Sequence, residues 1–263
     1  MMPIALTIAG SDPSGGAGIQ ADLKTFHQFG VYGMSVITLL TVQNTCKVSA
    51  VETVAPQLVL DQMEAVLEDL PPQAAKTGAL GSSEIIRAVA GRAARFPFPL
   101  VVDPVMISKH GAPLLDEEGR DALARELLPH AALVTPNVHE AMALAGKEFH
   151  GEAIPRAALE EAAKAIAGLG AKAVLIKGGH LAADATDLLF LDGRFTAYPG
   201  KRIETRHTHG TGCTYSAAIT AELAKGVELT EAIAAAKRFI ARAIETNPGL
   251  GHGYGPVNHF TPV

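Results

Sequence analysis

Short apolar runs alternate along the chain with longer segments in which apolar residues recur every three or four positions. The short runs predict buried strands, and they lie at residues 4–9, 35–42, 74–77, 100–103, 133–135 and 173–177. The longer segments predict helices, and they lie at residues 17–29, 56–70, 83–96, 117–128, 138–145, 156–169, 212–225 and 231–246. Pro56 suits the first turn of its helix, and Asp116 is expected to cap the helix that follows it.

This alternation of strands and helices indicates a mainly parallel sheet with helices on both faces. Two further runs, 186–191 and 195–198, flank Asp192 and Gly193, a pair typical of a hairpin turn, so an antiparallel edge is also expected. No linker or repeat divides residues 1–263, which we therefore expect to form one domain. Ligands of such sheets bind at the carboxyl ends of the strands, so polar residues that end strands are candidates for a site.

Composition narrows the class of protein. Hydrophobic residues make up 48% of the chain and charged residues 19%, which allows a large core and argues against disorder. The net charge of −5 comes without a Lys/Arg block, so neither a nucleic acid nor an anionic membrane is an expected partner. The first residues, MMPIALTIAGSD, reach polar and Gly-rich sequence too soon for a signal peptide, and no apolar run is long enough to span a bilayer. Cys46 and Cys213 form no CxxC pair, so we expect a reduced, cytoplasmic protein.

The first Gly-rich loop, residues 10–18, follows a predicted strand and opens a predicted helix. Its glycines allow close approach of the backbone to a ligand, and the helix start offers N–H groups. It is not a Walker A loop, since no Gly-Lys-Ser/Thr follows. A loose GxGxxA pattern is present, but no Asp or Glu lies between Asp22 and Glu52 to bind a ribose, which disfavours a nicotinamide enzyme. The alternative is a purely structural βα turn.

The second Gly-rich loop, residues 208–214, also precedes a predicted helix. Gly210 and Gly212 expose successive N–H groups at a positive helix end, which favours binding of an anion. Cys213 at this position is expected to have a lowered pKa and some thiolate character. Phosphoryl transfer needs such N–H groups together with a base, and both are available here. The alternative is a structural loop with an inert thiol.

Polar residues end three of the predicted strands. Asp103 follows one strand, Asn137 follows the next with Glu140 one helical turn later, and Lys177 follows a third. Carboxylates at a sheet edge can hold Mg²⁺ through water, and a lysine can bind a phosphate. Each of these residues taken alone is better explained as a cap or turn residue, but together at one edge they favour a site. The histidines, His207 and His209 included, fit neither HExxH nor the zinc-finger spacings.

Ordered motifs along nearly the whole chain resemble the hydroxymethylpyrimidine and phosphomethylpyrimidine kinases of thiamine biosynthesis, in the ribokinase-like superfamily. The motifs are TIAGSDPSGGAGIQADLKTF, TVQNT, VVDPVMISKHG, TPNVHEA, IKGGH, HTHGTGCTYSAAI and GHGYGPVNHF. The resemblance implies a ribokinase-like three-layer α/β/α sandwich with a mainly parallel central sheet. It also implies MgATP-dependent phosphorylation of 4-amino-5-hydroxymethyl-2-methylpyrimidine and then of its monophosphate, by a homodimer.

The same resemblance implies roles for individual residues. Cys213 would be the base, and the N–H groups of Gly210, Thr211, Gly212 and Cys213 would stabilise the transferred phosphoryl group. Substrate-binding positions would be Gln43, Gly10, Asp22 and Val105. The Mg²⁺ positions would be Asp103 and Glu140. The ATP-binding positions would be Asn137, Lys177, Thr208 and, as a weaker candidate, Lys237. Residues 107–112 would form a mobile flap.

One departure from the family pattern leaves the substrate open. Ala79 stands where many family members carry a methionine expected to pack near the substrate ring. A larger or reshaped pocket keeps a pyridoxine, pyridoxal or pyridoxamine kinase as the alternative. The flap itself has no cysteine of the kind that some relatives use to trap pyridoxal. A non-catalytic pyrimidine- or thiamine-sensing module is the alternative from another class, and Cys213, Lys177 and Asp103 argue against it because a binding protein needs none of them.

Overall fold

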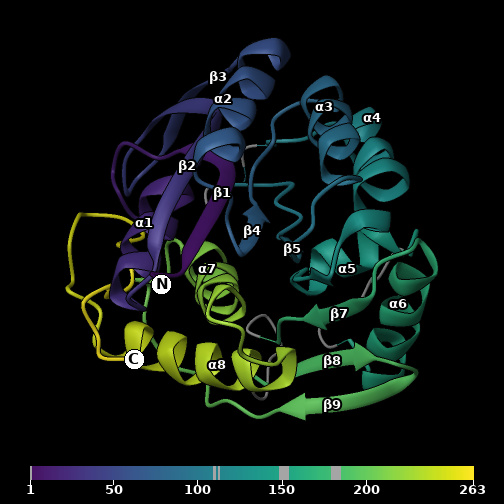
Figure 1. Cartoon of the computed structure of the whole chain (residues 1–263). Coiled ribbons are helices and arrows are strands. Elements are labelled where there is room, and N and C mark those ends of the chain that lie inside the picture. Colours follow the sequence, from purple (N-terminus) through teal and green to yellow (C-terminus); the bar gives the residue numbers. More distant parts are fainter. Residues whose placement is uncertain (1, 109–110, 112, 148–153, 179–184) are drawn as a thin grey trace.

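The computed structural model describes residues 2–108, 111, 113–147, 154–178 and 185–263. Their centre is a nine-stranded sheet in the order β3-β2-β1-β4-β5-β6-β7-β8-β9 (Figure 1). The strands are β1 (Ile4–Ser11), β2 (Tyr32–Gln43), β3 (Val48–Thr53), β4 (Ala74–Thr77), β5 (Leu100–Val102), β6 (Leu133–Val134), β7 (Ala173–Ile176), β8 (Asp187–Leu191) and β9 (Arg194–Tyr198). The six neighbouring strands β2, β1, β4, β5, β6 and β7 pair in parallel. Strand β3 at one edge and strands β8 and β9 at the other pair antiparallel.

Helices cover both faces of the sheet and enclose two separate hydrophobic clusters (Figure 1). One face carries α1 (Gly18–Gln28), α7 (Thr211–Ala224) and α8 (Leu229–Glu245). The other carries α2 (Pro56–Asp69), α3 (Ser83–Ala93), α4 (Glu117–Ala122), α5 (Val138–Leu144) and α6 (Arg156–Gly168). Burial of apolar side chains on both faces explains why the central strands read as continuous apolar runs. The predicted three-layer α/β/α architecture is confirmed.

Most predicted elements are present, with ends shifted by a few residues. The side chain of Asp116 accepts the N–H of Gly119 at 2.8 Å, as expected of an N-cap. The hairpin turn also occurs, with Asp192 at φ 49° and Gly193 at φ 75°. Two features differ from the prediction. Strand β3 was missed because nearly all of its side chains are exposed, and the helix predicted at 117–128 becomes a π-helical turn and then a 3₁₀ turn after Ala122.

The sheet also determines where polar residues gather. Strands β1, β4, β5, β6 and β7 are parallel, so their carboxyl ends meet at one edge. Asp103, Asn137 and Lys177 follow β5, β6 and β7 at that edge, and Asn137 and Lys177 form a bridge between their backbones. Within the described part of the chain, no helix combines the length and apolar character needed to cross a membrane.

Candidate active site

A cavity of about 970 Å³ opens at the carboxyl edge of the sheet. Both Gly-rich loops border it, and it extends to the second half of α8, where Lys237, Ile240 and Ile244 line it. The residues predicted for the site all line it, namely Gly10, Asp22, Gln43, Ala79, Asp103, Val105, Asn137, Glu140, Lys177, Thr208, Gly210, Thr211, Gly212, Cys213 and Lys237. Residues that are far apart in the sequence therefore share one cavity, as the strand-end argument predicted.

The two Gly-rich loops pack directly against each other. Gly210 is the N-cap of α7 with φ 77°, and a Cβ there would lie 1.8 Å from the carbonyl oxygen of Gly16, so only glycine fits. An α-helix leaves its first N–H groups without partners inside the helix, and the positive end of the helix dipole lies behind them. The start of α7 therefore offers the anion-binding N–H groups expected from the sequence.

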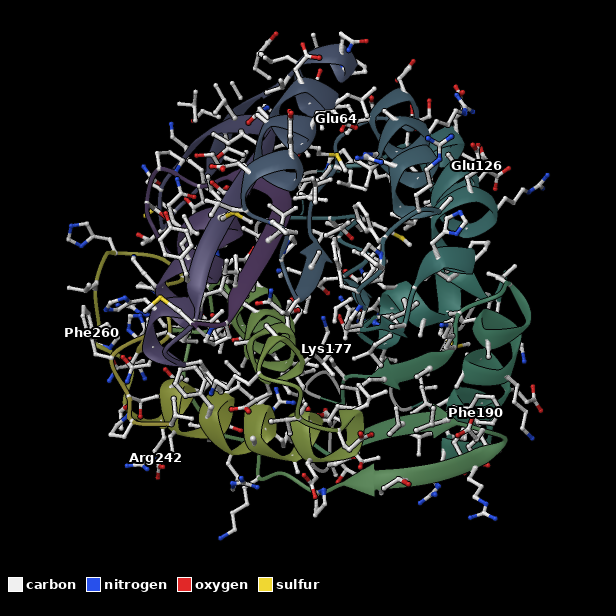
Figure 2. The ribbon with its side chains drawn as sticks, viewed as in Figure 1. Glu64, Glu126, Lys177, Phe190, Arg242 and Phe260 are labelled. Carbon is white, nitrogen blue, oxygen red and sulfur yellow. The ribbon has the colours of Figure 1, made fainter. Side chains whose placement is uncertain are left out.

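Lys177 supplies a fixed positive charge beside this helix start. Its Nζ lies 2.8 Å from Oδ1 of Asp103, and a Cβ on Gly212 would lie 3.3 Å from the same ammonium group. Burial alone would lower the pKa of Lys177, but the carboxylates of Asp103 and Glu140 outweigh it and raise that pKa above its usual value. The lysine thus remains protonated. Figure 2 shows it near the middle of the molecule, beside α7.

Asn137 and Glu140 form a capping box at the start of α5. The Asn137 side chain accepts the Glu140 N–H at 2.9 Å, and the Glu140 carboxylate accepts the Asn137 N–H at 2.8 Å. Burial, followed by repulsion from Asp103, raises the pKa of Glu140 to about 7 despite the attraction of Lys177. Two carboxylates close enough to repel each other suit a divalent cation that retains most of its water. The described residues contain no group of three or more His, Cys, Asp or Glu side chains that would hold a metal without water or substrate.

Cys213 lies half-buried in the first turn of α7, but its electrostatics differ from expectation. Burial raises the pKa of its thiol to about 11, and the charges of Asp22 and Asp103 act in the same direction. The ammonium of Lys76 opposes them without reversing the shift. The prediction of a lowered pKa is therefore wrong for the protein without ligands, because loss of solvent and two carboxylates outweigh the helix start.

A buried ion pair below the cavity escaped the sequence analysis. Asp22, predicted near the substrate, accepts a hydrogen bond from Thr7 at 2.6 Å and lies 2.7 Å from Nζ of Lys76. The Lys76 and Asp22 side chains are both 0% exposed. The available signal was a lysine within a predicted buried strand, where an unpaired charge would be very costly.

Asp187 is a second residue that the sequence analysis missed. It accepts the Gly178 N–H at 2.8 Å and the Tyr215 hydroxyl at 2.9 Å. It also lies 2.7 Å from the Nζ of Lys237, the weaker ATP-binding candidate. An acid at the first position of a buried strand is the signal that was available.

The substrate-binding candidates line another part of the cavity. Val105 follows Asp103 in a tight turn, and the carbonyl of Ala79 accepts the Thr38 hydroxyl at 2.6 Å. The amide Nε2 of Gln43 lies 3.2 Å from Nε2 of His209, a residue that the sequence analysis had set aside. The predicted flap at 107–112 falls partly outside the described residues, which exclude 109–110 and 112.

Such a site suits the transfer of a phosphoryl group, because it presents N–H groups and a fixed cation to a migrating anion. Residues 12–258 match the family described as Phosphomethylpyrimidine kinase, and the chain belongs to this family of kinases. The resemblance seen in the motifs is thereby confirmed, and membership in a kinase family favours an enzyme over a non-catalytic sensing module.

Full-length relatives support this assignment. A protein of Rhizobium meliloti (strain 1021) named hydroxymethylpyrimidine/phosphomethylpyrimidine kinase is 51% identical, over 99% of this chain and 98% of the relative. A protein of Haemophilus influenzae with the same name is 48% identical, over 97% of this chain and 96% of the relative.

Solved structures agree on the fold. A phosphomethylpyrimidine kinase from Clostridium difficile 630 has a TM-score of 0.80 at 45% identity, over 92% of this chain and 99% of its own. The pyridoxal kinase from Staphylococcus aureus in complex with AMP-PCP and pyridoxal has a TM-score of 0.90 at 36% identity, over 99% of this chain and 94% of its own. The fold is therefore common to kinases named for two different substrates.

Proposed function

We propose that this kinase transfers the γ-phosphoryl group of ATP to the hydroxymethyl group of 4-amino-5-hydroxymethyl-2-methylpyrimidine, and then to the resulting monophosphate, in thiamine biosynthesis. The observation that carries the proposal is the placement of Lys177, 2.8 Å from Asp103, beside the start of α7 in the cavity. Relatives that match nearly the whole chain carry both kinase activities in their names.

In this proposal the start of α7 and Lys177 stabilise the charge on the phosphoryl group in flight. The N–H groups of Gly210, Thr211, Gly212 and Cys213 face that charge. Asn137, Thr208, Lys177 and Lys237 hold the phosphates of ATP, which fits the adenine nucleotides named in the structures of related kinases. Gly10, Asp22, Gln43, Ala79 and Val105 surround the substrate ring. Stabilisation by fixed donors is the main contribution, since phosphoryl transfer asks for little covalent chemistry from the protein.

Asp103 and Glu140 would hold Mg²⁺, largely through water. The ion would neutralise charge that develops on the phosphates. The raised pKa of Glu140, about 7, fits this role. Burial and the carboxylate of Asp103 disfavour the ionised form of Glu140, and a nearby cation would stabilise that form. Asp103 meanwhile keeps Lys177 in place.

Cys213 would accept the proton of the substrate hydroxyl. With a pKa of about 11, only a small fraction of the thiol is ionised near neutral pH, so its contribution is smaller than that of a base tuned to that pH. The second step needs no such base, because a phosphate monoester loses its second proton with a pKa of about 6. The first step is therefore the one that depends on Cys213.

The wider setting is also part of the proposal. We infer a single domain over residues 1–263, supported by the one continuous sheet, and a homodimer, as the family resemblance implies. A cytoplasmic location fits the two free cysteines, Cys46 and Cys213.

A pyridoxal-type kinase is the second candidate. Ala79 leaves room at the cavity wall, and the Bacillus subtilis pyridoxal kinase has a TM-score of 0.89 at 40% identity. Incubation with MgATP and a panel of the pyrimidine, its phosphate, pyridoxine, pyridoxal and pyridoxamine, followed by ³¹P NMR, separates the two candidates. Diphosphate formation from the pyrimidine supports the proposal, whereas turnover of the B6 vitamers alone overturns it.

A further inference from the structure

Three polar side chains meet at one corner of the cavity. Oδ2 of Asp12 lies 2.7 Å from Nε2 of His209, and both side chains are 4% exposed. Nε2 of Gln43 lies 3.2 Å from the same imidazole nitrogen. All three residues line the cavity, and Gln43 is only half-buried. One imidazole nitrogen thus contacts both a carboxylate and an amide that faces the cavity.

The carboxylate determines which atom carries the proton. Asp12 accepts the N–H groups of Ser14 and Ala17, each at 2.9 Å. Burial would raise the pKa of Asp12, but the hydrogen bonds from His209 and Ser14 outweigh it and leave that pKa below its usual value. An ionised carboxylate only accepts hydrogen bonds, so Nε2 of His209 must carry a hydrogen directed at Asp12.

The imidazole is also held in place by its surroundings. The backbone N–H of His209 donates to the carbonyl of Gly255 at 3.0 Å. A Cβ on Gly16 would lie 2.5 Å from Cδ2 of the imidazole, so the ring packs tightly against this glycine. Turning the ring away from Asp12 would therefore disturb both the first Gly-rich loop and the C-terminal segment.

Gln43 then faces a donor. With its NH₂ group toward His209, two N–H donors oppose each other across 3.2 Å. A turn of 180° about the last side-chain bond exchanges the amide oxygen and nitrogen without changing the shape of the side chain. That turn places the oxygen, an acceptor, beside the N–H of His209, which Asp12 and Gln43 then share, and it places the NH₂ group toward the cavity.

We propose that Asp12 and His209 are positioning residues that hold the Gln43 amide with its NH₂ group toward the substrate, so that the site selects rings with a hydrogen-bond acceptor at that edge. The inference builds on the proposed function, which places the ring beside Gln43. The acceptor is an unprotonated ring nitrogen in a pyrimidine. Replacing that nitrogen by C–H leaves the NH₂ group without a partner, and a buried donor without a partner weakens binding.

Neutron diffraction of the deuterated protein without substrate tests the orientation directly. Deuterium is expected on Nε2 of His209 and on the end of the Gln43 amide that faces the cavity. An ND₂ group directed at His209 would overturn the inference. This measurement requires no substrate, so it decides the orientation even if the proposed function fails.

Selectivity is tested by calorimetric binding of the pyrimidine alcohol and of its two analogues in which one ring nitrogen is replaced by C–H. The wild-type protein should bind one of the analogues about 10- to 100-fold more weakly than the pyrimidine. Gln43→Glu offers only oxygens to the cavity, so the preference should fall to within about 3-fold. Asn44→Asp is the control, because it adds the same charge one residue away and keeps the oxygen that accepts the N–H groups of Cys46 and Lys47.

The outcomes distinguish failure of the inferred Gln43 orientation from failure of the proposed substrate. A Gln43→Glu variant that keeps the wild-type preference, or a wild-type protein that binds both analogues as well as the pyrimidine, contradicts the inference. If none of the three rings binds, the proposed substrate is wrong, and the neutron result alone decides how the amide is held.

Discussion

Lys177 and Asp103 follow strands β7 and β5, two positions apart in the sheet, and their charged groups lie 2.8 Å apart across the end of β6. Thr135, which follows β6, donates its hydroxyl to the same oxygen of Asp103 at 3.2 Å. The ammonium group is therefore in position before any substrate binds. A preorganised charge of this kind stabilises a transition state without reorganisation during the reaction.

Replacing Lys177 should remove that charge. We expect Lys177→Met to lower kcat by about 10²-fold or more, the range for loss of one stabilising group. Asp103 would also lose its partner, so the thermal midpoint should fall. Lys172→Met, at an exposed position just before β7, serves as the control and should retain wild-type kinetics. Wild-type kcat in Lys177→Met would rule out the electrostatic role.

The thiol of Cys213 gives a prediction about pH. Its pKa is raised to about 11, so it is protonated at neutral pH, and the reactive thiolate increases about tenfold per pH unit up to that value. In a Cys46→Ser background, alkylation by iodoacetamide should be slow at pH 7 and still rising above pH 9. The alkylation rate of the exposed Cys46, measured in a Cys213→Ser background, serves as the comparison. A rate at Cys213 that levels off near pH 7 would show a thiolate that the structure does not account for.

The buried pair Lys76 and Asp22 should behave as one unit in folding. Lys76→Met leaves the carboxylate of Asp22 without its ion pair in the interior, which costs about 3–5 kcal/mol. The double variant Lys76→Met with Asp22→Asn removes both charges and should be more stable than the single variant. Urea denaturation at pH 7 measures both. A double variant that is no more stable than Lys76→Met alone would contradict the expected pairing.

The sequence predicted the fold well where burial creates a pattern. Strand β5, three fully buried residues, appears within the predicted range because its apolar side chains face both helical layers. Strand β3 was missed because an exposed edge strand has no buried face to reveal it. The π-helical turn after α4 lies in a segment whose apolar periodicity predicts one continuous helix, so the pattern gave no sign of it.

The sequence predicted the site residues that follow strands but not the contacts between loops. Asp103 and Lys177 could be found because parallel topology alone brings strand ends to one edge. The contact between Asp12 and His209 joins residues 197 positions apart, and the pairing of Lys76 with Asp22 joins residues 54 apart. Such contacts depend on how loops pack, which the sequence pattern does not describe. The raised pKa of Cys213 also depends on this packing, because burial is its main cause.

The C-terminal segment, whose role the sequence did not reveal, is tied to the start of α7. Nε2 of His259 lies 3.0 Å from the hydroxyl of Thr214. Burial, followed by the electrostatic effects of Lys24 and His209, lowers the pKa of His259 to about 4. The unfolded chain takes up a proton near pH 6.5 and the folded one does not, so stability is lost as pH falls from about 6.5 to about 4.

Replacing His259 should therefore flatten the acid side of the stability profile. His259→Gln keeps a hydrogen-bonding group near Thr214 but cannot titrate. Wild type should lose about 2–3 kcal/mol more than this variant between pH 6.5 and pH 4. His27→Gln, at an exposed histidine, should follow the wild-type curve. Parallel curves for wild type and His259→Gln would show that His259 is not buried in its neutral form.

The two proposed phosphorylation steps should differ in their dependence on Cys213. The first acceptor is an alcohol, which must lose a proton as it attacks. The second is a phosphate, whose second pKa of about 6 leaves it ionised near neutral pH. Both steps need the positive helix start and Lys177, and the second needs them more because two anions must approach each other. Cys213→Ser should therefore reduce kcat on the alcohol by about 10²-fold, within the range for a lost base, and on the monophosphate by much less.

Paired initial rates on the two substrates at saturating MgATP measure this ratio directly. Thr211→Ala is the informative comparison, because the Thr211 side chain donates to the carbonyl of Thr208 at 2.8 Å and shapes the turn that serves both steps. Its losses should be similar on the two substrates. Equal losses for Cys213→Ser would instead place Cys213 among the residues that shape the turn. A wild-type protein that stops at the monophosphate under prolonged excess of MgATP would reject the two-step scheme, and a single-step kinase would then explain the geometry of Lys177 and Asp103 equally well.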